Sequence, residues 1–220
     1  MRQESSDSPL MASQVFLDHV PAGVLAAMLR AVLQSYKDAS SACYETMRPR
    51  QAKDASGPFR RNKIESELVG VGERFQQVIS VEDNLYKRGT GNYVELTCGV
   101  VKMTESCVPS PKDFPRDADY RETLAESTQL VLGFVPAETP GKYLYAILLH
   151  GVDGTAKQRS GCRFAQVRFP LKGFASYTED RVDLFAMFPS IVAEYSDQSA
   201  TADEVHTMLP LRVIPKIGEA

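Results

Sequence analysis

The sequence of 220 residues contains no tryptophan, so its nine tyrosines and ten phenylalanines supply all of its aromatic bulk. No apolar run approaches the roughly 20 residues that span a bilayer, and the longest, from Tyr143 to Leu149, has the length of a strand. The first ten residues lack the continuous apolar segment of a secretory signal. We therefore expect a cytoplasmic protein that does not enter a membrane.

Recognisable motifs of metal and cofactor chemistry are also missing. The cysteines are scattered and form no C-x-x-C pair, which excludes the usual spacings of zinc sites and disulfide scaffolds and predicts four buried, reduced thiols: Cys43, Cys98, Cys107 and Cys162. Gly70 and Gly72 lie inside a helical pattern rather than at a strand-to-helix turn, so they do not form a phosphate-binding loop. We expect no metal and no cofactor, and we assign no catalytic residue.

The composition is that of an ordinary globular protein. Hydrophobic residues make up 43% of the chain and charged residues 24%, and the formal net charge of -3 indicates no gross attraction to nucleic acid or membranes. We predict a solvated tail over 1–12 and a single α+β domain over 13–220. Its helical part covers about 13–80 and its sheet part about 90–217.

Two helices are predicted near the N-terminus. Apolar residues recur at three- and four-residue steps over 22–47 and again over 58–79, as expected for helices with one buried face. Pro21 suits a helix start, and Pro49 ends the first pattern. We expect the segment 48–57 to link the helices into an antiparallel hairpin, with Ser56 capping the second.

Strand patterns dominate the rest of the chain. We expect a loop over 105–119, a short helical turn over 120–126, and a helix over 179–195 that Pro189 ends or kinks. Strands are predicted at 93–103, after the turn Gly89–Gly91, and at 129–135, 142–152, 162–171 and, as an edge strand, 209–217. The predicted fold is α+β: an N-terminal helical hairpin packed on a mainly antiparallel sheet of four to five strands, with a further helix near the C-terminus.

Positive charge gathers in two segments of the chain. Segment 48–63 carries six cations and one acid, and segment 157–172 carries five cations and no acid. If the two segments meet in space, they form a site for phosphate, nucleic acid or an acidic partner. Its candidate residues are Arg60, Arg61, Lys63, Lys157, Arg159 and Arg163. Ordinary solvated surface is the alternative interpretation.

Two further sets of residues were weighed for chemistry. Glu65, Glu67, Asp83 and Glu95 have the helix-then-strand order of some metal-dependent nucleases. Glu95 is not followed two residues later by a lysine, so surface or interhelical charges explain these acids better. His150 ends an apolar strand three residues before Asp153, which would orient it as half of an acid–base pair. A structural hydrogen bond explains a histidine at a strand end equally well.

The sequence thus favours a non-enzymatic binding or assembly protein that uses a protein partner or self-association. The alternative is a nucleic-acid-associated protein, including a divergent metal-dependent nuclease, that uses segments 48–63 and 157–172. A third hypothesis is a small-molecule enzyme centred on His150, which requires a concave pocket there.

Overall fold

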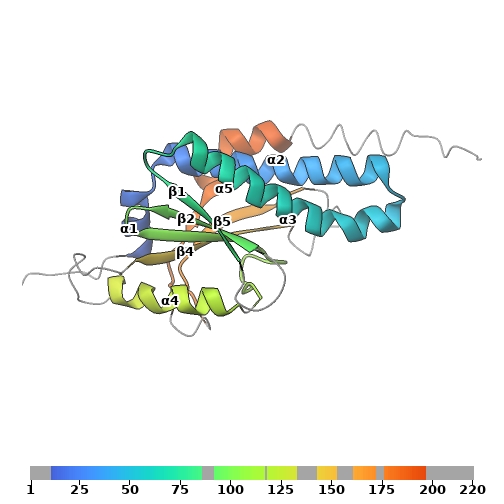
Figure 1. The fold of residues 1–220 in the computed structure, drawn as a ribbon. Coiled ribbons are helices and arrows are strands. Elements are labelled where there is room, and N and C mark those ends of the chain that lie inside the picture. Colours follow the sequence, from blue (N-terminus) through green and yellow to red (C-terminus); the bar gives the residue numbers. More distant parts are fainter. Residues whose placement is uncertain are drawn as a thin grey trace, which may run out of the picture.

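The protein is described by a computed structural model that covers residues 11–85, 92–116, 118–132, 143–152, 161–171 and 176–196. Figure 1 shows helices α2 (Ala22–Thr46) and α3 (Pro49–Arg74) side by side over one face of a central sheet. Helix α4 (Asp119–Leu132) lies across the other face, and the short helix α1 (Ala12–His19) precedes α2. The α+β class predicted from the sequence, with N-terminal helices packed on a mostly antiparallel sheet, is confirmed.

Helices α2 and α3 form the predicted hairpin, but the link between them is much shorter than expected. Residues 48–57 were predicted as a connecting segment, and nearly all of them belong to α3. Pro49 stands in the first turn of α3, where a missing backbone N–H is tolerated, and Pro58 lies inside the helix. Ser56 does not cap the helix, because its hydroxyl donates to the Lys53 carbonyl at 3.0 Å. Proline at 49 both stops one helix and starts the next.

The sheet has six strands that follow one another in sequence order. Five neighbouring pairs exist, and four of them are antiparallel. The pair β3–β4 is parallel, which corrects the expectation of a continuous antiparallel meander. Helix α4 supplies the crossover that a parallel pair requires. The strands are β1 (Ser80–Leu85), β2 (Asn92–Cys98), β3 (Val101–Cys107), β4 (Leu144–Gly151), β5 (Phe164–Arg168) and β6 (Val182–Asp183).

The strand predicted over 93–103 is in fact a hairpin made by β2 and β3. Gly99 has a φ of 57°, a left-handed conformation that glycine adopts without steric penalty. A Cβ at this position would also lie 2.9 Å from the ring of His19. The chain therefore reverses direction at a glycine inside the run that was predicted as one strand.

The segment between the two parallel strands also differs from its predicted structure. The loop predicted over 105–119 starts only at Val108, because Glu105 and Cys107 belong to β3. The helical turn predicted over 120–126 is the beginning of α4, and the helix continues to Leu132. The strand predicted over 129–135 is therefore wrong in its first four residues, and 133–135 lie outside the described residues.

The later strands agree better with the prediction. Strands β4 and β5 lie inside the predicted 142–152 and 162–171. The helix predicted over 179–195 is wrong over 179–183, a stretch that contains β6, and the helix starts only at Leu184. It is interrupted at Phe188, so that α5 (Leu184–Met187) is followed by a second helical stretch over 189–196. Pro189 is thus a break, as expected. The predicted edge strand at 209–217 and the turn Gly89–Gly91 lie outside the described residues.

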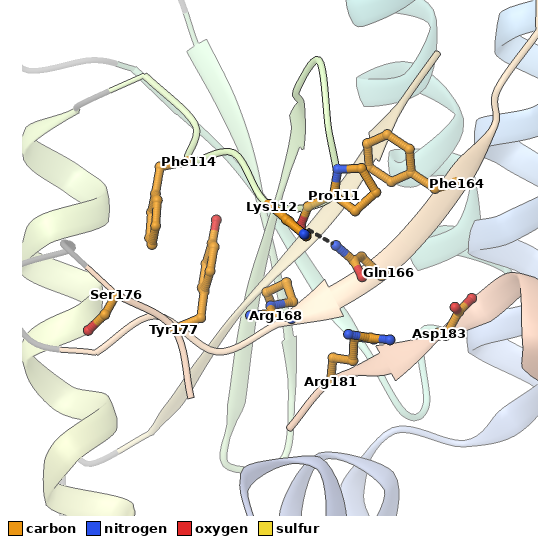
Figure 2. A pocket seen from close by; sticks show the side chains of 10 residues that line it. All are labelled: Pro111, Lys112, Phe114, Phe164, Gln166, Arg168, Ser176, Tyr177, Arg181 and Asp183. Atoms are coloured by element: carbon orange, nitrogen blue, oxygen red, sulfur yellow. Dashed lines mark hydrogen bonds between the residues drawn. The ribbon is translucent and has the colours of Figure 1, made fainter. Parts of the chain in front are cut away.

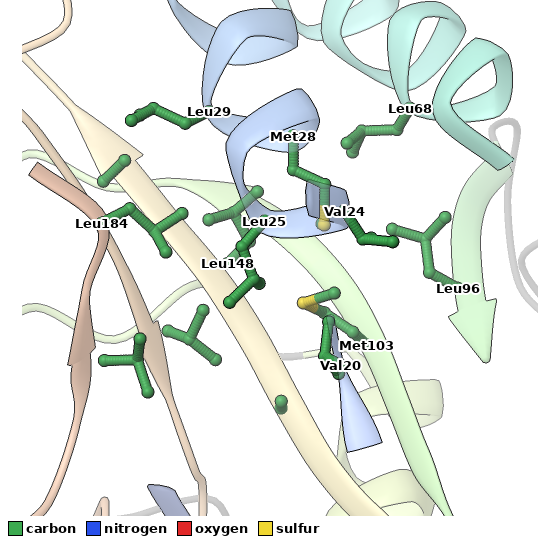
Figure 3. Close-up of a cluster of buried hydrophobic side chains, with 14 of the residues drawn as sticks. Val20, Val24, Leu25, Met28, Leu29, Leu68, Leu96, Met103, Leu148 and Leu184 are labelled. Atoms are coloured by element: carbon green, nitrogen blue, oxygen red, sulfur yellow. The ribbon is translucent and has the colours of Figure 1, made fainter. Parts of the chain in front are cut away.

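The sheet is packed on both faces. The larger hydrophobic core lies between the sheet and helices α1, α2, α3 and α5; Figure 3 shows Leu25 and Met28 of α2 above Met103 and Leu148 of the parallel strands. A smaller core on the other face holds Tyr145, Ile147 and Leu149 of β4 together with Leu124 and Ala125 of α4. Because every residue of β4 is buried, this strand forms the centre of the molecule.

Helix α3 approaches the sheet closely at one glycine. A Cβ added to Gly72 would overlap the side chain of Val81 on β1, whereas a Cβ at Gly70 would meet no atom within 4 Å. The packing of α3 against β1 therefore requires glycine at position 72 but not at position 70.

Candidate functional site

Polar side chains from four elements meet between the helical layer and the parallel strands. Glu105 and Cys107 are two residues apart on β3, so both side chains project from the same face of the sheet. In the parallel register Cys107 lies beside His150 at the end of β4. Tyr36 reaches the same place from α2 and Arg60 from α3. We call these five residues the thiol cluster.

His150 is the buried centre of the thiol cluster, with 1% of its surface exposed. Its Nε2 lies 2.8 Å from Oε2 of Glu105, and its Nδ1 lies 2.9 Å from the Tyr36 hydroxyl oxygen. Burial lowers the pKa of His150, but hydrogen bonds and charges from Cys107 and Glu105 outweigh burial and raise the pKa to about 9. The imidazole is therefore protonated and charged at neutral pH.

A protonated His150 sets the direction of the hydrogen bonds. Its two ring N–H groups donate to Glu105 and to the Tyr36 oxygen. The Tyr36 O–H is then directed to the sulfur of Cys107, which lies 3.6 Å away. The result is a continuous chain of hydrogen bonds from Cys107 through Tyr36 and His150 to Glu105.

Cys107 is the exposed end of this series of hydrogen bonds. The expectation of four buried thiols is therefore wrong for Cys107. Nη2 of Arg60 donates to its sulfur at 3.7 Å. Partial burial raises the pKa of the thiol, but His150, Arg60 and the Tyr36 hydroxyl lower it more, so that the pKa falls from 9.0 to about 7. About half of the Cys107 population is thiolate at neutral pH.

Tyr36 is held in place from two sides. Its ring meets the ring of His150 edge to face, with the centroids 5.6 Å apart and the planes at 90°. The Arg60 guanidinium lies over the same ring, 4.3 Å from its centroid. Burial, together with the charges of Cys162 and Cys107, raises the pKa of Tyr36 well above 10.0. Tyr36 therefore stays neutral and passes a hydrogen bond rather than a charge.

The other cysteines have different surroundings. Cys43 and Cys98 are buried, and Cys162 is partly exposed and donates to the Phe164 carbonyl at 3.1 Å. Burial raises the pKa of Cys162 to about 12 despite backbone hydrogen bonds that lower it. Of the four thiols, only Cys107 combines exposure with a lowered pKa.

Four of the six residues predicted to bind anions lie in the described part of the chain. Arg60 belongs to the thiol cluster, Arg61 pairs with Glu65 at 3.1 Å, and Lys63 pairs with Glu67 at 2.8 Å. Arg163 is exposed beside β4, to which it donates its backbone N–H. Lys157 and Arg159 lie outside the described residues, so the predicted meeting of segments 48–63 and 157–172 stays a prediction.

The acids considered for metal binding are each paired. Glu65 and Glu67 hold the cations just named, Asp83 accepts from Asn92 at 2.7 Å, and Glu95 binds Lys102. Within the described ranges no group of three or more His, Cys, Asp or Glu side chains is arranged to hold a metal ion. Ion pairs account for Glu65, Glu67 and Glu95, and a hydrogen bond from an amide accounts for Asp83.

The sequence identified His150 as a candidate but did not identify the carboxylate that the structure places beside it. Asp153 lies outside the described residues, and the carboxylate that holds the ring is Glu105. The cluster members Tyr36, Glu105 and Cys107 were missed. An available signal was the spacing of Glu105 and Cys107, which puts an acid and a thiol on one face of a strand.

Two further observations concern the chain as a whole. In the part of the chain that the structure describes, no single helix has the length and apolar composition to cross a bilayer; the bent pair α1 and α2 meets those two criteria together. Comparisons with protein-family models, curated proteins and solved structures give no match for this chain.

Proposed function

We propose that this protein is a thiol redox protein in which Cys107 cycles between a thiolate and an oxidised form. The observation that carries the proposal is the exposed residue Cys107, whose sulfur is joined through Tyr36 to the buried His150–Glu105 pair. Cysteines that respond to oxidants are characteristically accessible and have a low pKa. Perturbed pKa values in a cluster of titratable groups are typical of functional sites.

The accessibility of each group favours redox chemistry over acyl transfer. In acyl transfer a histidine must give its proton to the leaving group of the substrate. His150 is 1% exposed and both of its ring nitrogens already have partners, so no substrate atom reaches it. Tyr36 is 2% exposed and is equally screened. The buried groups therefore act on the thiol, which they hold as a thiolate, and leave only the sulfur to react.

The oxidant that fits this arrangement is a hydroperoxide. The Cys107 thiolate attacks one peroxide oxygen, an S–O bond forms, and the O–O bond breaks. The sulfur loses two electrons and becomes a sulfenic acid, while the second oxygen takes up a proton and leaves as water or an alcohol. Arg60, whose Nη2 lies 3.7 Å from the sulfur, is placed to donate to the oxygen on which negative charge develops.

Return to the thiolate requires two molecules of a low-molecular-weight thiol. The first attacks the sulfenic sulfur, forms a mixed disulfide and releases water. The second attacks the mixed disulfide as a thiolate and releases Cys107, so that both electrons come from the added thiols. His150 keeps Cys107 a good leaving group, because a thiol of low pKa leaves faster.

Trapping of the sulfenic acid tests the proposal. The protein is treated with one equivalent of hydrogen peroxide and a dimedone-type reagent, and adducts are located by peptide mass spectrometry. We expect the adduct on Cys107, and its loss in Cys107→Ser. The matched control Cys162→Ser removes a thiol of raised pKa and should leave labelling unchanged. Equal labelling of all four cysteines, or none on Cys107, would refute the proposal.

The roles favoured by the sequence remain separate proposals. A non-enzymatic binding or assembly function is compatible with a redox thiol, because oxidation of Cys107 would disturb contacts that join α2 and α3 to the sheet. A nucleic-acid-associated function, including metal-dependent cleavage, depends on segments 48–63 and 157–172 and keeps its own salt-dependent test.

A further inference from the structure

A second site lies on the other face of the sheet. Side chains alternate along β5, so that Ala165 and Val167 enter the large core below α2 while Phe164, Gln166 and Arg168 face away from it. These three residues form one wall of a cavity of about 510 Å³, a size that suits a small ligand. We call it the basic pocket. Its other walls come from the segment after β3, the segment before β6 and the end of β6 itself: Pro111, Lys112, Phe114, Ser176, Tyr177, Arg181 and Asp183 (Figure 2).

The basic pocket is built by contacts between segments far apart in the sequence. The side-chain amide of Gln166 donates to the Pro111 carbonyl at 2.6 Å and ties the segment after β3 to β5. Figure 2 shows the rings of Phe114 and Tyr177 face to face, with centroids 4.1 Å apart and an angle of 6° between the planes. The Arg168 guanidinium lies 4.7 Å from the centroid of the Tyr177 ring. The walls are therefore held by packing and need no ligand to form.

Positive charge in this pocket is not compensated. Three cations, Lys112, Arg168 and Arg181, line the cavity with one carboxylate, Asp183. Oδ1 of Asp183 already accepts two backbone N–H groups at the start of α5. Within the described ranges, none of the three cations forms an ion pair. The lining of the pocket therefore holds three cations and one carboxylate.

Unsatisfied polar atoms support the same conclusion. Nε of Arg168 and the hydroxyl of Tyr177 are buried and have no hydrogen-bond partner in the described part of the chain. Burial lowers the pKa of Arg168, and the nearby charge of Arg181 adds to this effect, whereas Tyr177 and the charge of Asp180 oppose it. Buried polar groups normally have partners, and a pair of neighbouring cations is stabilised by an anion between them.

We propose that the basic pocket binds the phosphate group of a small phosphorylated molecule. A phosphate monoester carries nearly two negative charges and three acceptor oxygens, which matches three cations better than a single carboxylate does. Arginine and lysine side chains are the usual protein ligands of phosphate. The ring of Phe114, which is 37% exposed, offers an apolar surface beside the charged site for the rest of the molecule.

Isothermal titration calorimetry with inorganic phosphate, adenosine monophosphate and succinate tests the proposal. We expect both phosphates to bind with dissociation constants in the millimolar range or below, adenosine monophosphate more tightly than inorganic phosphate, and succinate at least tenfold more weakly. Higher salt should weaken binding, because the attraction is electrostatic. Preference for succinate over phosphate would refute the assignment of a phosphate site.

Charge-removing variants locate the binding. Lys112 and Arg181 are exposed, so Lys112→Gln and Arg181→Gln should fold normally and each should weaken phosphate binding about tenfold. Lys53→Gln removes the same charge from the exposed side of α3 and should leave binding unchanged. Equal effects from all three variants would show binding to general positive charge, and no effect from the pocket variants would place the phosphate elsewhere. Either result overturns the proposal of a phosphate site. The labelling of Cys107 tests the proposed redox function separately and does not depend on phosphate binding.

Discussion

Replacement of His150 by glutamine tests the central electrostatic claim about the thiol cluster. Glutamine keeps a hydrogen-bonding side chain of similar reach but removes the positive charge that favours the Cys107 thiolate. The pKa of Cys107 stands at about 7 instead of 9.0, and His150 is the largest of the groups that lower it. In His150→Gln the pKa should therefore rise toward 9. Arg60 and Tyr36 still act on the sulfur, so the rise will be less than complete.

The size of the effect on reactivity follows from two opposing terms. At pH 7 a rise of the Cys107 pKa from about 7 to 9.0 would reduce the thiolate fraction from about one half to about one hundredth, roughly 50-fold. A more basic thiolate is intrinsically more nucleophilic, and over two pKa units this returns about six- to tenfold. The rate at pH 7 should therefore fall by at most about five- to eightfold. Well above pH 9 the variant should react faster than the native protein.

Alkylation of Cys107 by iodoacetamide, followed by mass spectrometry from pH 5 to pH 11, measures this change. The native midpoint should lie near 7 and the midpoint of His150→Gln nearer 9. Arg60→Gln should shift the midpoint in the same direction by a smaller amount, and circular dichroism checks that both variants fold. A native midpoint near 9, or identical profiles for native protein and His150→Gln, would refute the claim that His150 stabilises the Cys107 thiolate.

Three further predictions concern packing and partners. Gly70→Ala should stabilise the protein by about 1 kcal/mol through helix propensity, whereas Gly72→Ala should destabilise it by about 1–3 kcal/mol, because the new methyl group overlaps Val81. Urea unfolding measures both changes in stability. Equal effects of the two substitutions would contradict the close packing of α3 on β1 at Gly72. If the basic segments bind nucleic acid, affinity for DNA or RNA should fall steeply with salt, and undetectable binding at low salt would exclude this role. If the protein self-associates, light scattering should give more than the monomer mass of 24.3 kDa at micromolar concentration.

The elements predicted well from the sequence are those with a long hydrophobic pattern or with uniformly buried residues. Helix α2 presents an apolar stripe over 25 residues, and β4 is an apolar run of strand length. The alternation of side chains along β5 does not predict that its polar face lines a pocket, because Lys112 and Arg181 come from separate segments.

Wrong assignments arose where local preference and tertiary structure disagree. The segment 48–57 is rich in small and charged residues that predict a link, but packing of α3 along α2 makes it helical. The apolar run Leu130–Leu132 resembles a strand, and these residues form the end of α4 instead. Short apolar runs fit either structure, and only the surrounding fold decides between them.

The thiol cluster could not be predicted for a topological reason. In the order expected from the sequence, a strand at 129–135 stood between those at 93–103 and 142–152, and Cys107 belonged to the loop 105–119. The crossover through α4 makes the strands parallel, so Val101 pairs with Leu144 and Cys107 pairs with His150. Glu105, Cys107 and His150 meet only because β3 and β4 run in the same direction and end side by side. The same crossover brings that edge beneath α2 and α3, which supply Tyr36 and Arg60, so the chemistry of Cys107 depends on the one parallel pair in the sheet.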